Sequence, residues 1–403
     1  MITLLDKARH GWRSMTRTAT APHEIEFQPS KNELTLGVEV ELQLMDAQTM
    51  NLAPRAEEML AALADNPKVK PEFYLSTIEA NTGICADVGE VERDLKPTLD
   101  AMAQVAAERG IALATTGCHP FARYSDCIIA DTARYQELID RNQWLTRRMT
   151  VYGLHVHVGM KSGDDCIRYN NFFMHVLPHL LALSASSPFW QGDDTGLSSC
   201  RPTTYEALPT AGMPYEGVHS WADFEKLYHT LKACGSIQSL KDLWWDLRPS
   251  PGFGTLEIRV CDGLPSLAGT LAITAFIHGL AHWFRDHGEW MAQVPRPASW
   301  VMRENKWRVI RHGLEAELVT NNQGATKPIR QDIEEWLTKI APYTDALGYS
   351  GYIATLRDIM AQGTSSERQR AVFARTQSLQ EVARHNAHEF AKGHPVWVKS
   401  NAA

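Results

Sequence analysis

The chain has 403 residues, 44% of them hydrophobic and 22% charged, with a formal net charge of −7. This composition supports a sizeable core and argues against a disordered chain, and the lack of a basic surplus argues against a nucleic-acid binder. The seven cysteines form no Cys-x-x-Cys pair, which disfavours both a disulfide framework and a zinc ribbon. We therefore expect a cytoplasmic protein that acts on small molecules and does not bind nucleic acid or membrane.

Residues 1–33 show little periodicity and are interpreted as an N-terminal extension that is either loose or packed on a partner subunit, which leaves a homo-oligomer open. A single domain is expected over 34–395. It begins with Leu34 to Leu44, where apolar and polar residues alternate with the period of a strand. Further strands are expected at 72–79, 111–116, 151–160 and 255–261.

Helices are expected between and after these strands, at 91–109, 132–148, 166–187, 268–290, 301–320, 327–341, 351–362 and 366–391, so that the C-terminal third is helix-rich. The most apolar stretch, Leu267 to Phe284, is interrupted by two histidines and is better explained as a buried core helix than as a membrane span. The segment 189–214 is dense in Gly, Pro, Ser and Thr, and a loop of this length is usually functional or disordered.

The strands do not alternate regularly with helices, as a doubly wound parallel sheet would require. An α+β fold is therefore expected, with a mostly antiparallel sheet and helices packed on one of its faces.

Several of the expected strands carry polar side chains at positions two residues apart, which point to the same face of a strand. The pairs are Glu39 and Glu41, His155 and His157, and Glu257 and Arg259, and Glu79 ends a further strand. One such pair alone is best explained by exposure to solvent, because charged residues are mostly exposed. Their recurrence on three strands favours a sheet whose polar face is a concave active-site floor.

The types of residue on this face indicate the chemistry. Carboxylate oxygens with an imidazole suit magnesium, with manganese as the alternative, better than they suit zinc. Arg248 and Arg259 would bind phosphate oxygens beside them. Carboxylates, a divalent metal and arginines together are typical of phosphoryl transfer. Because the sequence has no P-loop and no complete Rossmann motif, the metal-bearing sheet would itself have to hold ATP.

Ordered segments along the chain resemble a known family. They are Leu36-Gly-Val-Glu-Val-Glu-Leu42, Glu79-Ala-Asn-Thr-Gly83, Gly117-Cys-His-Pro120, Gly153-Leu-His-Val-His-Val-Gly159, Ser184-Ala-Ser-Ser-Pro-Phe-Trp190, Asp194-Thr-Gly196, Trp245-Asp-Leu-Arg-Pro249, Gly254-Thr-Leu-Glu-Ile-Arg259 and Glu304-Asn-Lys-Trp307. Each segment is a weak signal, but in this order they resemble the bacterial carboxylate–amine ligases of the glutamate–cysteine ligase type 2 group. The resemblance covers the chain from about residue 34 to the helices near 390.

The resemblance implies a catalytic domain similar in fold to glutamine synthetase. It also implies roles for individual residues. Two or three magnesium ions would be held by Glu39, Glu41, Glu79, His157 and Glu257. Arg248 and Arg259 would contact the phosphates of ATP, with Arg259 and His155 as catalytic residues. His155 is the less defined member of its pair, either supporting the ligands or contacting phosphate. Substrate contacts would come from Asn81, Thr82, Arg201 and Tyr205.

The implied reaction joins glutamate and cysteine at the expense of ATP, giving γ-glutamylcysteine, ADP and phosphate through a γ-glutamyl phosphate intermediate. A ligase with the same chemistry and a different amine acceptor is one alternative. The others are a metal-dependent amidohydrolase, with zinc on His155 and His157, and a regulatory protein that binds ATP or glutamate. The amidohydrolase would need a barrel with further His and Asp ligands on later strands.

Overall fold

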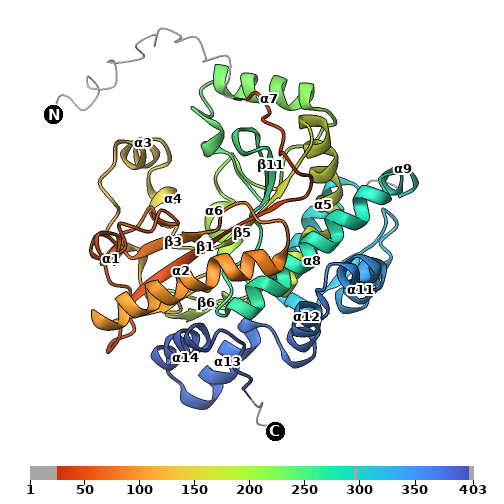
Figure 1. Ribbon diagram of the computed structural model, residues 1–403. Helices are drawn as coiled ribbons and strands as arrows, with labels where there is room; N and C mark the ends of the chain where they lie inside the picture. The colour runs from red at the N-terminus through yellow and green to blue at the C-terminus, as the bar shows by residue number, and fades with distance from the viewer. Residues whose placement is uncertain (1–24, 295–296, 399–403) are drawn as a thin grey trace, which may run out of the picture.

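The computed structural model describes residues 25–294 and 297–398, and its centre is a seven-stranded sheet in which all neighbouring strands are antiparallel (Figure 1). The strands follow the order β10-β11-β5-β1-β3-β2, and β4 pairs with the C-terminal part of β1. Their bounds are β1 Leu36–Asp46, β2 Val69–Pro71, β3 Thr77–Asn81, β4 Ile111–Ala114, β5 Leu154–Gly159, β10 Leu247–Ser250 and β11 Thr255–Ile258.

Helices and short strands fill the connections. The helices are α1 Ala56–Ala62, α2 Val88–Glu108, α3 Ala133–Asn142, α4 Trp144–Arg147, α5 Gly163–Ser184, α6 Arg201–Tyr205, α7 Trp221–Ala233, α8 Leu267–Asp286, α9 Trp290–Gln293, α10 Ser299–His312, α11 Ile329–Ala346, α12 Ser350–Gln362, α13 Ser365–Thr376 and α14 Leu379–Lys392. Three small pairs lie outside the main sheet: β6 Phe189–Trp190 with β7 Asp193–Asp194, β8 Ala211–Gly212 with β9 Trp244–Trp245, and β12 Glu317–Val319 with β13 Thr326–Pro328. Short 3₁₀ turns include η2 Leu240–Asp242 and η3 Pro251–Phe253.

One face of the sheet is buried under helices α2, α5 and α8, which contact β1, β11 and β5 respectively. Val38, Val40 and Leu42 of β1 point into this layer and are almost fully buried. Because side chains alternate along a strand, their neighbours Glu39 and Glu41 are directed to the opposite face. The hydrophobic core thus leaves the other face of the sheet to polar residues.

Helix α8 lies within this core. It is long and apolar enough to cross a bilayer, but 83% of its most apolar window is buried inside the protein. Its histidine His278 lies between the Tyr349 hydroxyl, 2.7 Å away, and the Leu34 carbonyl oxygen, 2.8 Å away. The interpretation of this stretch as a core helix is confirmed.

The expected α+β architecture is confirmed, and several element boundaries are corrected. The strand expected at 72–79 exists only as β3, because residues 72–76 turn before they enter the sheet. The helices expected at 132–148 and 366–391 are each divided in two by a residue with positive φ, Gln143 and Gln377. The helix expected at 301–320 ends at His312, where Gly313 with φ +55° follows. Helices α1 and α7 and strands β2 and β10 were not expected.

Part of the expected N-terminal extension packs on the sheet. The Gln28 amide donates to the Pro251 carbonyl oxygen at 2.9 Å, and the Ser30 amide donates to that of Met160 at 3.0 Å. A Cβ at Gly254, which has φ +66°, would stand 1.9 Å from the Gln28 carbonyl oxygen, so this close approach requires glycine. Residues of the expected extension from Gln28 onward therefore contact the domain, and residues 1–24 lie outside the described part of the chain.

Candidate active site

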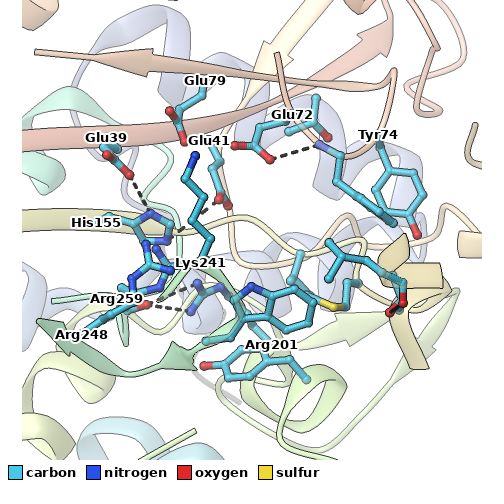
Figure 2. A pocket seen from close by; sticks show the side chains of 18 of the residues that line it. Glu39, Glu41, Glu72, Tyr74, Glu79, His155, Arg201, Lys241, Arg248 and Arg259 are labelled. Carbon is cyan, nitrogen blue, oxygen red and sulfur yellow. Dashed lines mark hydrogen bonds and ion pairs between the residues drawn. The ribbon is translucent and has the colours of Figure 1, made fainter. Parts of the chain in front are cut away.

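A cavity of about 400 Å³ opens over the polar face of the sheet. Figure 2 shows side chains from several separate segments converging on it. Its lining includes Glu39, Glu41, Glu79, His155, Arg201, Tyr205, Arg248 and Arg259, which are most of the residues that the sequence analysis selected, and it also includes Glu72. His157 and Glu257 lie in the same face but below the cavity surface, as buried neighbours of Glu39.

The antiparallel register explains why these residues meet. Glu39 stands opposite His155 across the β1–β5 pair, and His157 stands opposite Glu257 across the β5–β11 pair. Arg248 in turn stands opposite Glu257. Residues directly opposite in a sheet have Cβ atoms about 5 Å apart and share a face. Register alone therefore assembles one continuous polar row from four strands.

Two guanidinium groups enclose the buried carboxylate of Glu257 at one end of this row. Arg248 is bidentate, with Nε 2.9 Å from Oε2 and Nη2 3.1 Å from Oε1, and Arg259 donates to Oε1. Burial opposes ionisation of Glu257, but Arg248 and Arg259 hold the pKa of this carboxyl well below its usual range. We call this region, Arg248 with Arg259, the arginine end of the cavity.

The two histidines lie between the arginine end and the remaining glutamates. His155 Nδ1 is 3.1 Å from Glu39 Oε2, and His157 Nε2 is 3.2 Å from Glu39 Oε1. The Thr255 hydroxyl, 2.8 Å from His157 Nδ1, fixes the orientation of that ring. Burial disfavours ionised Glu39, yet its hydrogen bonds with His155 and His157 lower the pKa of this carboxyl. Glu39 is thus ionised and shared by both imidazoles.

A cluster of three carboxylates lies at the opposite end of the sheet. Oxygens of Glu41, Glu72 and Glu79 are within 4.8 Å of one another, and we call these residues the acidic triad. Burial and the neighbouring carboxylates raise the pKa of Glu79 well above its usual value and that of Glu72 to about 7. Asn81 donates to Glu79 Oε1 at 2.7 Å and the Gly153 amide donates to Glu41 Oε2 at 2.5 Å.

Glu72 is a site residue that the sequence analysis missed. It was placed at the start of a strand ending at Glu79, and seven residues along a strand lead to the opposite face. Because residues 72–76 turn instead, Glu72 returns to the same side as Glu79. No local sequence signal distinguishes this turn from a strand.

The donor atoms fit divalent cations of the magnesium type. Three groups of ligands have donor atoms within 4.8 Å of one another: the acidic triad; Glu39 with His157 and Glu257; and Glu39 with Glu79 and His155. His155 Nε2 is buried and has no hydrogen-bond partner among the described residues. Because buried polar atoms are normally paired, this nitrogen is available to bind a ligand. Clustered carboxylates raise one another's pKa, and a bound cation would remove that repulsion. Oxygen-rich sites of this kind suit hard ions.

Of the four residues expected to contact substrate, two line the cavity and two do not. Arg201 and Tyr205 of α6 line the cavity, where Arg201 donates to the Arg259 carbonyl oxygen at 3.3 Å and the Tyr205 hydroxyl to Asp246 Oδ1 at 3.3 Å. Asn81 supports Glu79 instead of lining the cavity. The Thr82 hydroxyl accepts from the Val38 amide and donates to the Gly83 carbonyl oxygen, so it is not brought to the cavity surface.

Most of the rest of the lining comes from segments outside the sequence motifs, and Trp245 and Asp246, which belong to the 245–249 motif, are exceptions. Helix α3 contributes Arg134, Tyr135 and Leu138, and the β2–β3 turn contributes Phe73 and Tyr74. The turn at η2 and the strand β9 contribute Lys241, Trp244 and Trp245, and η3 contributes the exposed ring of Phe253. These contacts join residues remote in sequence, so they could not be found from spacing.

An open antiparallel sheet with carboxylates, imidazoles and paired guanidinium groups on one face is an arrangement typical of enzymes that transfer phosphoryl groups. Comparison with known proteins gives the family. The model of glutamate–cysteine ligase family 2 (GCS2) matches residues 35–388. Relatives from Bdellovibrio bacteriovorus and Gloeobacter violaceus, both provisionally named glutamate–cysteine ligase 2, are each 44% identical to this chain. They match over 90% and 88% of it, respectively, and over 96% of their own length. The chain belongs to glutamate–cysteine ligase family 2 and is a carbon–nitrogen ligase.

Solved structures share the fold at low sequence identity. A glutamate–cysteine ligase of Francisella tularensis in complex with AMP aligns with a TM-score of 0.59 and 15% identity, over 90% of each chain. A bifunctional glutathione synthetase of Pasteurella multocida aligns with a TM-score of 0.61 and 15% identity, over 90% of this chain and 53% of that one. The glutamine synthetase-like α+β fold expected from the sequence is thus confirmed.

Proposed function

We propose that this protein uses Mg-ATP to join the γ-carboxylate of glutamate to an amine. With cysteine, the acceptor that the names of its relatives indicate, the products would be γ-glutamylcysteine, ADP and phosphate. The observation that carries the proposal is the polar row itself, where the arginine end, the shared Glu39 and the acidic triad lie side by side on one sheet face. The AMP bound to the Francisella ligase, whose fold is shared, supports the use of a nucleotide.

The reaction would proceed in two displacements. A γ-carboxylate oxygen of glutamate attacks the γ-phosphorus of ATP, ADP leaves, and γ-glutamyl phosphate forms. The amine then attacks the acyl carbon, and phosphate leaves with the oxygen that came from glutamate. Arg248 and Arg259 would bind phosphate oxygens, since charge-assisted guanidinium contacts are strong and directional.

The other residues would bind the cations that neutralise phosphoryl charge, or would hold the ligand side chains in position. Glu39, His157 and Glu257 would hold one cation and the acidic triad another, and such ions neutralise charge on the phosphoryl group. Asn81 and the Gly153 amide keep Glu79 and Glu41 in place. Lys306, buried between Glu206 and Asp246, fixes the Asp246 carboxylate beneath Tyr205. No amidohydrolase barrel is formed, because the main sheet among the described residues is open.

The decisive experiment combines ADP release with an isotope label. Purified protein is mixed with Mg-ATP, glutamate labelled with ¹⁸O in its γ-carboxylate, and an amine. We expect ADP formation that requires glutamate, a γ-glutamyl amide product identified by mass, and one ¹⁸O in each released phosphate. ADP release without transfer of label would refute the acyl phosphate, and product formation without ATP would indicate a hydrolase working in reverse.

A further inference from the structure

The cavity has an apolar region that the ionic chemistry of the sheet does not use. Tyr74, Tyr135, Leu138, Met149 and Val151 line it together, and we call these residues the apolar wall. They come from the β2–β3 turn, from α3 and from the segment that precedes β5. An apolar lining of this kind determines which ligand side chains gain from leaving water.

The apolar wall is rigid where it meets the sheet. The Tyr74 hydroxyl donates to the Arg147 carbonyl oxygen at 2.6 Å. The ring of Phe73 makes edge contacts with Tyr74 and Tyr135, with centroids 4.8 and 5.0 Å apart. The aromatic corner is therefore built in before a ligand arrives, which reduces the entropy lost on binding.

The apolar wall lies at the acidic-triad end of the cavity. Phe73 follows Glu72 directly, and the carboxylates of Glu72 and Glu79 act electrostatically on Tyr135. Figure 2 shows Glu72 and Tyr74 on the side of the cavity away from Arg248 and Arg259. A nucleotide with its phosphates at the arginine end has the exposed ring of Phe253 available there for its base, next to His157 with centroids 5.8 Å apart. In that position the nucleotide would leave the apolar wall free.

Besides the arginine end and Arg201, the cavity lining holds the cations Lys241 and Arg134. Lys241 of η2 lines the cavity and forms no salt bridge within the described part of the chain, whereas Arg134 beside it lies 3.7 Å from Asp242. An ammonium group without a counter-ion would bind a carboxylate of the ligand.

We propose that the acceptor amine is an α-amino acid whose side chain is apolar and larger than that of cysteine. The side chain would pack on the apolar wall, and the carboxylate would lie against Lys241. The inference rests on the proposed ligase function and concerns only its acceptor. Each additional buried methylene is worth roughly fourfold in binding, so leucine, methionine or phenylalanine should exceed alanine and cysteine by at least about tenfold in kcat/KM.

The test measures glutamate-dependent ADP release with alanine, cysteine, serine, leucine, methionine and phenylalanine as acceptors, with products identified by mass. The expected result is the highest kcat/KM with the large apolar side chains. A preference for cysteine, alanine or serine would overturn the inference and leave the ligase function intact. ADP release with none of the acceptors would instead refute the proposed function together with the inference.

Variants locate the subsite. Met149→Gln keeps the length of a half-buried side chain and makes its end polar, so it should lower kcat/KM for leucine about tenfold while the KM values for ATP and glutamate stay within twofold. Met302→Gln, the same change at a half-buried position of α10 outside the cavity, is the matched control. Val151→Thr, which preserves shape, is a second variant with the same expected direction. A rise in the KM for ATP in either cavity variant would assign the wall to the nucleotide base and overturn the inference.

Discussion

At the scale of the residue, the site is a balance of like and unlike charges. Glu257 is ionised because two guanidinium groups surround it, whereas Glu72 and Glu79 resist ionisation because they are buried beside other carboxylates. Identical side chains thus differ in protonation through their neighbours alone. The acidic triad is the part of the site that most needs a cation, and the arginine end is the part that least needs one.

Replacement of Glu41 tests the acidic triad. Glu41→Gln keeps an oxygen that can accept from the Gly153 amide but removes one negative charge. We expect kcat/KM to fall at least about 100-fold, equivalent to about 2.7 kcal/mol, while the Tm stays equal or rises because repulsion within the triad decreases. Activity assays and thermal denaturation check this, with Glu57→Gln on the exposed face of α1 as the control. Wild-type turnover in folded Glu41→Gln would contradict the assignment.

Replacement of Phe253 tests whether the base of ATP stacks on this ring at the arginine end of the cavity. Its ring is 77% exposed although it borders the cavity, and an exposed aromatic ring at such a place is available for stacking. Because base–aromatic stacking is worth about 1–3 kcal/mol, Phe253→Ala should raise the KM for ATP about tenfold or more. The KM for glutamate and the Tm should not change. The control is Ile84→Ala, an exposed apolar side chain outside the cavity lining, and equal effects in the two variants would remove Phe253 from the site.

At the scale of the element, the strands of the main sheet position the charged side chains of the site. Helix α3 and the turn η2 enclose the cavity above them. Helix α3 and the turn η2 are joined over the cavity through Asp242, whose carboxylate lies 3.0 Å from Arg141 Nη1 and accepts from the Gln238 amide at 2.8 Å. Burial opposes ionisation of Asp242, but the hydrogen bond from Arg141 lowers the pKa of the carboxyl. The carboxylate is therefore charged at neutral pH and holds the two elements together.

Loss of this charge should loosen the enclosure. In Asp242→Asn, amide hydrogen exchange is expected to become faster in α3 and η2 but not in α2, whose apolar face is buried in the core. The KM for the amine should rise several-fold. Asp140→Asn, an exposed change on the same helix, is the control. Unchanged exchange in α3 would show that Asp242 does not hold the enclosure.

At the scale of the whole molecule, a buried histidine links folding to pH. His119 Nδ1 accepts from the Ala122 amide at 2.9 Å, and Nε2 lies 2.9 Å from the Met50 carbonyl oxygen, an arrangement that only the neutral ring satisfies. Burial lowers the pKa of His119 from its ordinary value of 6.5 to about 4. Between these values the unfolded chain binds more protons, so this stabilisation is complete above pH 6.5 and is lost as the pH falls towards 4.

The corresponding measurement is urea denaturation between pH 4 and 7. The His119 contribution to the free energy of unfolding should decrease by up to about 3 kcal/mol on acidification. His119→Asn should be less stable at pH 7 and show a shallower decline towards pH 4. His388→Asn, at an exposed histidine of α14, is the control. Parallel pH curves for wild type and His119→Asn would refute the linkage.

Strand periodicity predicted β1, β3, β4, β5 and β11 of the sheet and most of its polar face, but not β2 and β10. Alternation along β1, β5 and β11 identified Glu39, Glu41, His155, His157, Glu257 and Arg259, because a period of two allows only one assignment of faces. Helices were less well predicted. Gln143 and Gln377 break two of them with positive φ, and glutamine carries no sequence signal for that conformation.

The sequence by itself determined which residues of a strand share a face, because side-chain alternation is a local property of each strand. Only the tertiary structure decided which residues from different segments meet. Glu72 joined the acidic triad through a turn, and Thr82 was drawn away to the backbone of β1. Tyr135 and Lys241 reached the cavity through the packing of α3 and η2 over the sheet, and Met149 reached it from the segment between α4 and β5. Such contacts depend on loop closure and on burial of the whole core, which no local pattern encodes.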